Sequence, residues 1–136
     1  MLAQWALMLA PLAVAACSGV HHDAKARVVN VTERDFTIHV PARIPAGDVR
    51  LVVHNHGPDQ HELIVVRTTA AHLPLRSDAA TVDEDGLEPL TLATLEPGPV
   101  GSTRELDLHL RPGSYEVFCN MAGHYLGGMS ATFTVT

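Results

Sequence analysis

The chain has few cysteines and few positive charges, and its longest apolar run is too short to cross a membrane. Only two of its 136 residues are cysteine, and 9 Lys and Arg stand against 15 Asp and Glu, a formal net charge of −6. Such an acidic chain is unsuited to binding nucleic-acid phosphates, so we expect no nucleic-acid partner. No internal repeat is present, and no segment has the periodicity of a convincing amphipathic helix. These absences favour a small β-domain.

The first 16 residues, MLAQWALMLAPLAVAA, are uncharged and apolar and end in small side chains. This is typical of a secretory signal peptide. The run is shorter than the roughly 20 apolar residues of a membrane-spanning helix, and polar sequence follows at once. We therefore predict a signal peptide at 1–16, a tether at 17–26 and one domain at 27–136, near the usual size of a single domain.

The sequence VAAC at 14–17 resembles the bacterial lipobox, which implies that Cys17 carries lipid at the mature N-terminus. Two or more acyl chains hold a protein stably on a membrane, so we expect a periplasmic or cell-surface lipoprotein on the extracytoplasmic face of a bacterial membrane. The alternative is that Cys17 is an ordinary buried or disulfide-bonded cysteine. If Cys17 is lipidated, Cys119 has no partner in the chain, and metal ligation is one reason for keeping such a thiol.

Short segments of alternating apolar and polar residues, separated by Pro and Gly, predict an all-β domain. Alternation gives one apolar face to the segments at 36–40, 104–110 and 130–136. The segments at 49–55 and 61–66 are more uniformly apolar and are predicted to be central strands. Each strand must bury its apolar face against a second sheet, so we expect a β-sandwich of about seven or eight strands. Residues 67–102 show no clear period and are predicted to be a long connection, with room for a short helix.

Cys119, His124 and Met129 lie five residues apart near the end of the chain. Strand parity places the sulfurs of Cys119 and Met129 on the core faces of two successive strands. His124 lies in the loop between these strands, where glycine gives the backbone freedom to fold the imidazole back. The glycines concerned are Gly123, Gly127 and Gly128. The sequence thus predicts that three metal-binding side chains converge.

A second imidazole has to come from another part of the chain. His61 begins a strand and shares its core face with Leu63 and Val65, so it is the preferred candidate. His54 and His56, in or beside the preceding turn, remain alternatives. The other histidines of the domain are predicted to face solvent: His39, His72 and His109.

Two imidazoles, one thiolate and a weak thioether are the ligands of a blue, or type 1, copper site. A structural zinc site normally has four strong ligands, and a thioether is a poor fourth ligand. The residues therefore favour a single copper ion over zinc.

Two motifs, CNMAGHYLGGM at 119–129 and NHGPDQHE at 55–62, extend this interpretation. On these motifs the chain from about Arg27 to Thr136 resembles the cupredoxins, the small blue copper proteins, and most of all their rusticyanin and auracyanin branch. The resemblance implies a Greek-key β-sandwich and one type 1 copper ion. It also implies electron transfer between redox partner proteins. The ligands that it implies are His61, Cys119, His124 and Met129.

An enzyme is not expected. Multicopper oxidases resemble this fold but flank the cysteine with histidines, whereas Phe118 and Asn120 flank Cys119. A binuclear copper site needs two cysteines in the loop, and nitrite reductases need a second domain. We expect a monomeric electron carrier. The alternatives are a copper-delivery or copper-resistance protein of the cell envelope and a metal-free binding module. The excess of histidines keeps the copper-delivery alternative open, whereas the inward-facing Cys119 argues against it.

Three smaller hypotheses concern the surroundings of the site. The backbone N–H of Glu62, or of a neighbour of His124, is predicted to donate a hydrogen bond to the Cys119 sulfur. Asn55 either ties the His61 turn to the ligand loop or serves only as a turn residue. An exposed apolar patch for a redox partner is predicted around His124. Its members would be Met121, Ala122, Tyr125 and Leu126, although these residues could equally pack the loop.

Overall fold

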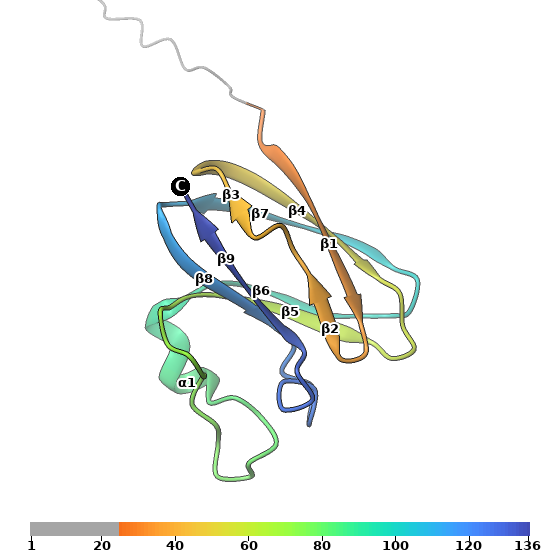
Figure 1. Cartoon of the computed structure of the whole chain (residues 1–136). Helices are drawn as coiled ribbons and strands as arrows, with labels where there is room; N and C mark the ends of the chain where they lie inside the picture. The colour runs from red at the N-terminus through yellow and green to blue at the C-terminus, as the bar shows by residue number, and fades with distance from the viewer. Residues whose placement is uncertain (1–24) are drawn as a thin grey trace, which may run out of the picture.

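The computed structural model describes residues 25–136, which form two β-sheets packed face to face (Figure 1). The predicted signal peptide (1–16), the lipidation site Cys17 and the tether as far as residue 24 lie outside the described residues. Within the described part, no helix has both the length and the apolar character needed to span a membrane.

The first sheet has four strands in the order β2-β1-β4-β7 and the second has five in the order β3-β9-β8-β5-β6. The predicted all-β sandwich is confirmed, with nine strands among the described residues. Strand β1 runs antiparallel to β2 but parallel to β4, and β3 runs parallel to β9, so both sheets are mixed. The strands are β1 (Arg27–Arg34), β2 (Thr37–His39), β3 (Arg43–Ile44), β4 (Gly47–Asn55), β5 (His61–Arg67), β6 (Thr91–Gly98), β7 (Thr103–Leu110), β8 (Gly113–Phe118) and β9 (Ser130–Val135).

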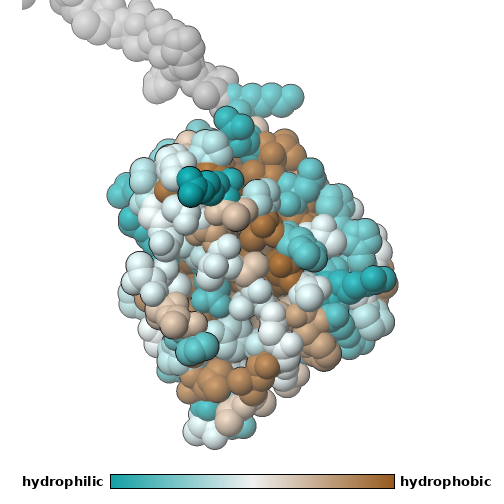
Figure 2. Space-filling model, in the orientation of Figure 1, coloured by the Kyte–Doolittle hydropathy of each residue, from teal (hydrophilic) through white to brown (hydrophobic). Residues whose placement is uncertain are grey.

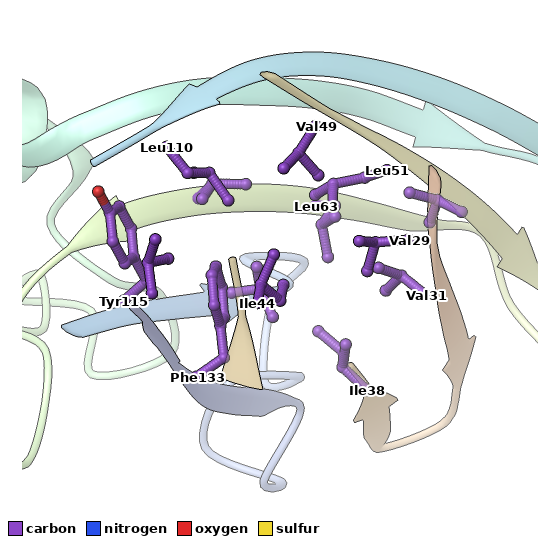
Figure 3. Packing of buried hydrophobic residues seen from close by; sticks show 14 of the residues in the cluster. Val29, Val31, Ile38, Ile44, Val49, Leu51, Leu63, Leu110, Tyr115 and Phe133 are labelled. Atoms are coloured by element: carbon purple, nitrogen blue, oxygen red, sulfur yellow. The ribbon is translucent and has the colours of Figure 1, made fainter. Parts of the chain in front are cut away.

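One hydrophobic core fills the space between the sheets (Figure 3). In β4 every second side chain is buried, because successive side chains of a strand point to opposite faces. At one end of the core the rings of Tyr115 and Phe133 stack with centroids 5.3 Å apart, and the Tyr115 hydroxyl donates to the Arg111 carbonyl. The alternating strands of the sequence therefore bury their apolar faces as predicted.

Strand β5 is buried on both faces, which explains its uniformly apolar sequence. Leu63 and Val65 face the main core, whereas Ile64 and Val66 belong to a second cluster on the outer face of the sheet. The connection between β5 and β6 supplies the cover for this outer face. Its buried side chains are Leu73, Val82 and Leu87.

The prediction of one long connection over 67–102 is partly wrong. The connection contains the expected short helix, α1 (Glu84–Leu87), continued by a 3₁₀ turn, η1 (Glu88–Leu90). Residues 91–98, however, form the edge strand β6, which pairs with β5. Two register shifts in this pairing and Pro97 disturb the alternation of two, so the strand is hard to recognise from its pattern.

The expected strand at 36–40 is shorter than predicted, because only Thr37–His39 is paired. Ile38 is buried as expected. Phe36, in contrast, is 44% exposed and does not belong to the core.

A buried ion pair joins two strands of the first sheet at one end of the sandwich, and its arginine also reaches the second sheet. Arg104 of β7 donates to the Glu33 carboxylate of β1 at 2.6 Å and also to the carbonyl of Glu96 in β6. A Cβ atom at Gly98 would collide with the Arg104 guanidinium, and Gly98 pairs with His61. The ion pair therefore lies close to the start of β5. Burial raises the pKa of Glu33 to about 7, because loss of hydration outweighs the attraction of Arg104.

Candidate metal centre

Three predicted ligands meet at the end of the sandwich where β5 begins and β8 ends. The potential ligand atoms of His61, Cys119 and His124 all lie within 4.8 Å of one another. The Cys119 sulfur is 3.7 Å from Nδ1 of His124, and the rings of His61 and His124 have centroids 5.2 Å apart. No other group of three His, Cys, Asp or Glu side chains within residues 25–136 is this close.

The ligands of the group differ in their burial. His61, Cys119 and Met129 are fully buried, while His124 is only half-buried. Its ring edge is therefore the part of the group nearest to solvent. A buried site with one ligand at the surface keeps its geometry fixed and still has an electronic contact with the outside.

Backbone hydrogen bonds hold the loop from Cys119 to Met129 in a compact form. The Met129 N–H donates to the His124 carbonyl at 3.0 Å, and the Cys119 N–H donates to the Met129 carbonyl at 3.1 Å. Met129 is thus tied through its backbone to both other ligands of the loop. Gly123 and Gly128 have φ values of +80° and +99°, which side-chain-bearing residues rarely adopt, so the expected use of glycine is confirmed at these positions.

The Cys119 thiol lies in an apolar environment that favours its neutral form. Burial raises the pKa of this thiol to about 11, although hydrogen bonds from the backbone N–H groups of Glu62 and Met121 act in the opposite direction. The N–H of Glu62 thus acts on the sulfur in the predicted direction. The Glu62 carboxylate in turn accepts the N–H of Asn120 at 2.9 Å, which couples the start of β5 to the residue after the cysteine.

His61 has different surroundings on the two sides of its ring. Burial lowers the pKa of His61, against the attraction of the nearby Asp35 carboxylate, so the neutral imidazole is favoured. Its Nε2 lies 2.9 Å from Oδ1 of Asp35, while its Nδ1 is buried without a hydrogen-bond partner. An unpaired buried ring nitrogen beside a thiol and a second imidazole is what a metal ligand requires.

The alternative histidines do not join this group. His54 is half-buried with its Nδ1 3.0 Å from the Thr103 hydroxyl, and His56 is exposed. His39, His72 and His109 are exposed, as predicted. Asn55 is the buried last residue of β4, and its side chain hydrogen-bonds Gly57, Asp59 and Gly98. It therefore ties the His61 turn to β6 rather than to the ligand loop.

Solved structures with the same architecture include auracyanins and rusticyanin. Reduced auracyanin from the photosynthetic bacterium Roseiflexus castenholzii superposes with a TM-score of 0.60 at 18% identity, covering 82% of this chain and 98% of that one. Auracyanin B gives a TM-score of 0.60 at 25% identity over 82% and 89% of the two chains. Rusticyanin from Thiobacillus ferrooxidans gives 0.58 at 17% identity over 82% and 79%. The chain has the cupredoxin fold. Neither protein-family models nor curated protein sequences match it.

A type 1 copper ion fits the residues that this cupredoxin fold brings together. Two imidazoles and a cysteine sulfur converge, and Met129, which is buried in the same hydrophobic core as Cys119, offers a thioether. The high pKa of the Cys119 thiol means that metal binding has to displace its proton, which a strongly thiophilic copper ion can do.

The connection between β5 and β6 forms hydrogen bonds with the ligand loop, a contact that the sequence analysis did not predict. The Asn120 side chain accepts the N–H of Val82 at 2.6 Å and donates to the Val82 carbonyl at 3.1 Å and to the Glu84 carboxylate at 2.6 Å. The Gly123 N–H donates to the Ala80 carbonyl at 2.9 Å. Both segments project from the same end of the sandwich (Figure 1). The cover of the second core is thus also a support of the cupredoxin metal loop.

Phe36 is a neighbour of His124 that the sequence analysis did not predict. Its ring meets the His124 ring edge-on with centroids 5.3 Å apart, and a Cβ atom at Gly127 would lie 2.8 Å from it. Gly127 therefore has a packing role, unlike the two glycines with positive φ. Leu126 and Phe36 are exposed by 54% and 44%, so apolar surface lies beside the exposed side of His124. Figure 2 shows hydrophobic residues gathered in a few places on a largely polar face, one of them at the bottom of the view.

Proposed function

We propose that this protein is a mononuclear blue copper protein that carries single electrons, with the copper held by His61, Cys119, His124 and Met129. The observation that carries the proposal is the convergence of two imidazoles and one buried thiol within 4.8 Å. Rusticyanin, one of the similar structures, is a copper protein. Bound copper supplies a one-electron couple whose soft sulfur and nitrogen ligands suit both oxidation states.

The chain's own residues favour electron transfer over copper delivery. A delivery site has to exchange its metal and is best served by exposed ligands, whereas His61, Cys119 and Met129 are fully buried. The ligand loop is also held by the connection between β5 and β6. A rigid, buried ligand set resists metal loss and needs little rearrangement when the oxidation state changes, which suits repeated electron transfer.

The edge of His124 and its apolar surroundings are the proposed point of electron exchange with partner proteins. Ala122 and Leu126 are exposed members of the predicted patch, and Phe36 extends it. Tyr125 instead packs against the second core, and its hydroxyl accepts the N–H of Leu73. Small apolar surfaces of this kind suit the brief encounters of redox proteins.

We further propose that the protein works outside the cytoplasm as a monomer, held by lipid on Cys17 to a bacterial membrane. The proposal rests on the apolar sequence at 1–16 and on the VAAC motif at 14–17. Mass spectrometry of the mature protein should find Cys17 as a lipidated N-terminal residue. An unmodified Met1 would contradict this part of the proposal.

Repeated redox cycling tests electron carriage against copper delivery. The protein, loaded with one equivalent of copper(II), is reduced and reoxidised several times in the presence of a copper(I) chelator. An electron carrier should keep its copper and recover its full visible absorption after each cycle. Transfer of the copper to the chelator in the first reduction would favour the delivery protein instead.

A further inference from the structure

Asp35 is the side chain that meets Nε2 of His61. It lies in the turn between β1 and β2, and its side chain is 16% exposed while that of His61 is fully buried. Its Oδ1 is 2.9 Å from Nε2 of His61, and neither atom has another hydrogen-bonding partner. The ring N–H is not well aligned with the oxygen, so the contact is electrostatic at hydrogen-bond distance.

The carboxylate is not itself one of the converging ligands. Asp35 is absent from the group whose ligand atoms lie within 4.8 Å of one another, although acidic side chains qualify for such a group. It therefore contacts His61 without being a member of the converging group. The turn that carries it is fixed, because the Asp35 N–H donates to the Gly57 carbonyl at 3.3 Å and the His56 N–H donates to the Glu33 carbonyl at 2.8 Å.

Two consequences follow from an acceptor at Nε2. A neutral imidazole has one N–H, and a carboxylate at Nε2 favours the tautomer with the proton there and a free lone pair on Nδ1. The negative charge also makes the ring a better donor toward a metal, as carboxylates behind metal-binding histidines generally do. Extra electron density at a ligand stabilises the more positive oxidation state of the metal.

We propose that Asp35 is a positioning residue of the copper site, which holds His61 with Nδ1 free for the metal and by its charge favours copper(II) over copper(I). The proposal rests on the proposed function, since it concerns the same site. Asp35, a turn residue outside both sequence motifs, would thus help to set the reduction potential.

The test compares Asp35→Asn with Asp59→Asn in the full chain. Asparagine is close in shape to aspartate but is uncharged and offers both an acceptor and a donor. Asp59 is a matched control, because it is an exposed carboxylate two residues before His61 and its loss changes the net charge equally. Asp35→Ser serves as a second neutral variant should Asp35→Asn fold poorly.

The first readout is the reduction potential of the copper-loaded protein. Loss of the carboxylate should weaken copper(II) binding relative to copper(I) about tenfold, the lower end of the range for such partners, which raises the potential by about 59 mV. Asp59→Asn should give a clearly smaller rise. Equal potentials for the Asp35 and Asp59 variants would overturn the effect of charge.

The second readout needs no copper. Nitrogen NMR of the metal-free protein should find His61 protonated at Nε2 in the wild type, with the Nδ1–H tautomer gaining population in Asp35→Asn. A wild-type His61 protonated at Nδ1 would overturn the proposal. A wild-type protein that develops no blue colour with copper(II) would instead overturn the proposed function and the effect on potential, and the tautomer would still decide whether Asp35 orients His61.

Discussion

Two buried ionisable residues, Glu33 and Cys119, have pKa values that burial raises. Cys119 is a metal ligand in the proposed site, so its cost of burial is removed when the thiolate binds copper. Glu33 has no such compensation. One of its oxygens is paired with Arg104, but the other is buried without a partner. Metal binding thus offsets the cost of burying Cys119, whereas the cost of burying Glu33 lowers the stability of the fold.

Glu33 should make the fold less stable as the pH rises toward neutrality. Its pKa rises from an ordinary value of 4.5 to about 7 in the folded protein. Between these values the unfolded chain releases the proton and the folded chain keeps it, so the free energy of unfolding falls by at most about 3 kcal/mol. Below about pH 4.5 and above about pH 7, Glu33 should not contribute to the change of the free energy of unfolding with pH.

Urea denaturation between pH 4.5 and 8 measures this effect. In the variant Glu33→Gln, most of the decline in the free energy of unfolding should disappear, because glutamine does not ionise. The glutamine still offers Arg104 a hydrogen-bond acceptor. The exposed Glu88→Gln is the control and should follow the wild type. A decline of equal size in Glu33→Gln would show that another group is responsible.

At the scale of elements, the loop from Cys119 to Met129 depends on the connection between β5 and β6. This segment covers the outer face of β5 with a small apolar core and at the same time hydrogen-bonds the ligand loop. Asn120 is the centre of this contact. The metal loop is therefore supported from the core side by its own strands and from the outside by a segment distant in the sequence.

Substitution Asn120→Ala should loosen the ligand loop. It leaves the buried N–H of Val82 without a partner, which costs roughly 1–3 kcal/mol, whereas the Val82 carbonyl keeps the N–H of Glu84. Hydrogen exchange should accelerate at the amides of Val82 and Gly123. Asn30→Ala, at an exposed position of β1, is the control. Unchanged exchange at both amides would show that these hydrogen bonds do not hold the loop.

Much of this architecture could be predicted from sequence patterns, because a strand with one buried face has a period of two. The uniformly apolar stretch at 61–66 correctly indicated a central strand, and this strand is buried on both faces. Strand β6 escaped prediction because its register shifts break that period. The acidic residues around α1 gave no sign that this segment covers a sheet.

The convergence of His61, Cys119 and His124 was predictable for the same reason, since strand parity fixes which side chains enter the core. The roles of Asp35, Phe36 and Asn120 were not. Each depends on a contact between segments far apart in the sequence, such as Asp35 with His61 or Asn120 with Val82. Such contacts have no local pattern and follow only from the packed structure.

At the scale of the whole molecule, the proposed metal site lies at the end of the sandwich where the ligand loop and the β5–β6 connection project (Figure 1). Exposed apolar side chains beside His124 provide the proposed contact surface, in a chain whose net charge is −6. Two copies of this acidic chain repel each other at distances within the Debye length. An uncharged apolar surface at the contact point avoids adding to this repulsion.

A charge in this surface should slow electron exchange. Leu126→Asp should reduce the rate of electron self-exchange between copper(I) and copper(II) protein severalfold. Val28→Asp is the matched control, because Val28 is 55% exposed and Leu126 54%, and both variants change the net charge equally. NMR line broadening in mixtures of the two oxidation states gives the rate. Equal slowing by both variants would indicate a general charge effect and contradict the proposed surface.

The central claim is that a buried thiolate binds copper beside two imidazoles. The most direct test is the visible absorption of the protein loaded with copper(II), next to a Cys119→Ser variant. We predict an intense blue band from sulfur-to-copper charge transfer in the wild type and its loss in the variant, since the band requires the thiolate. A colourless wild-type protein, or an unchanged band in Cys119→Ser, would contradict the claim.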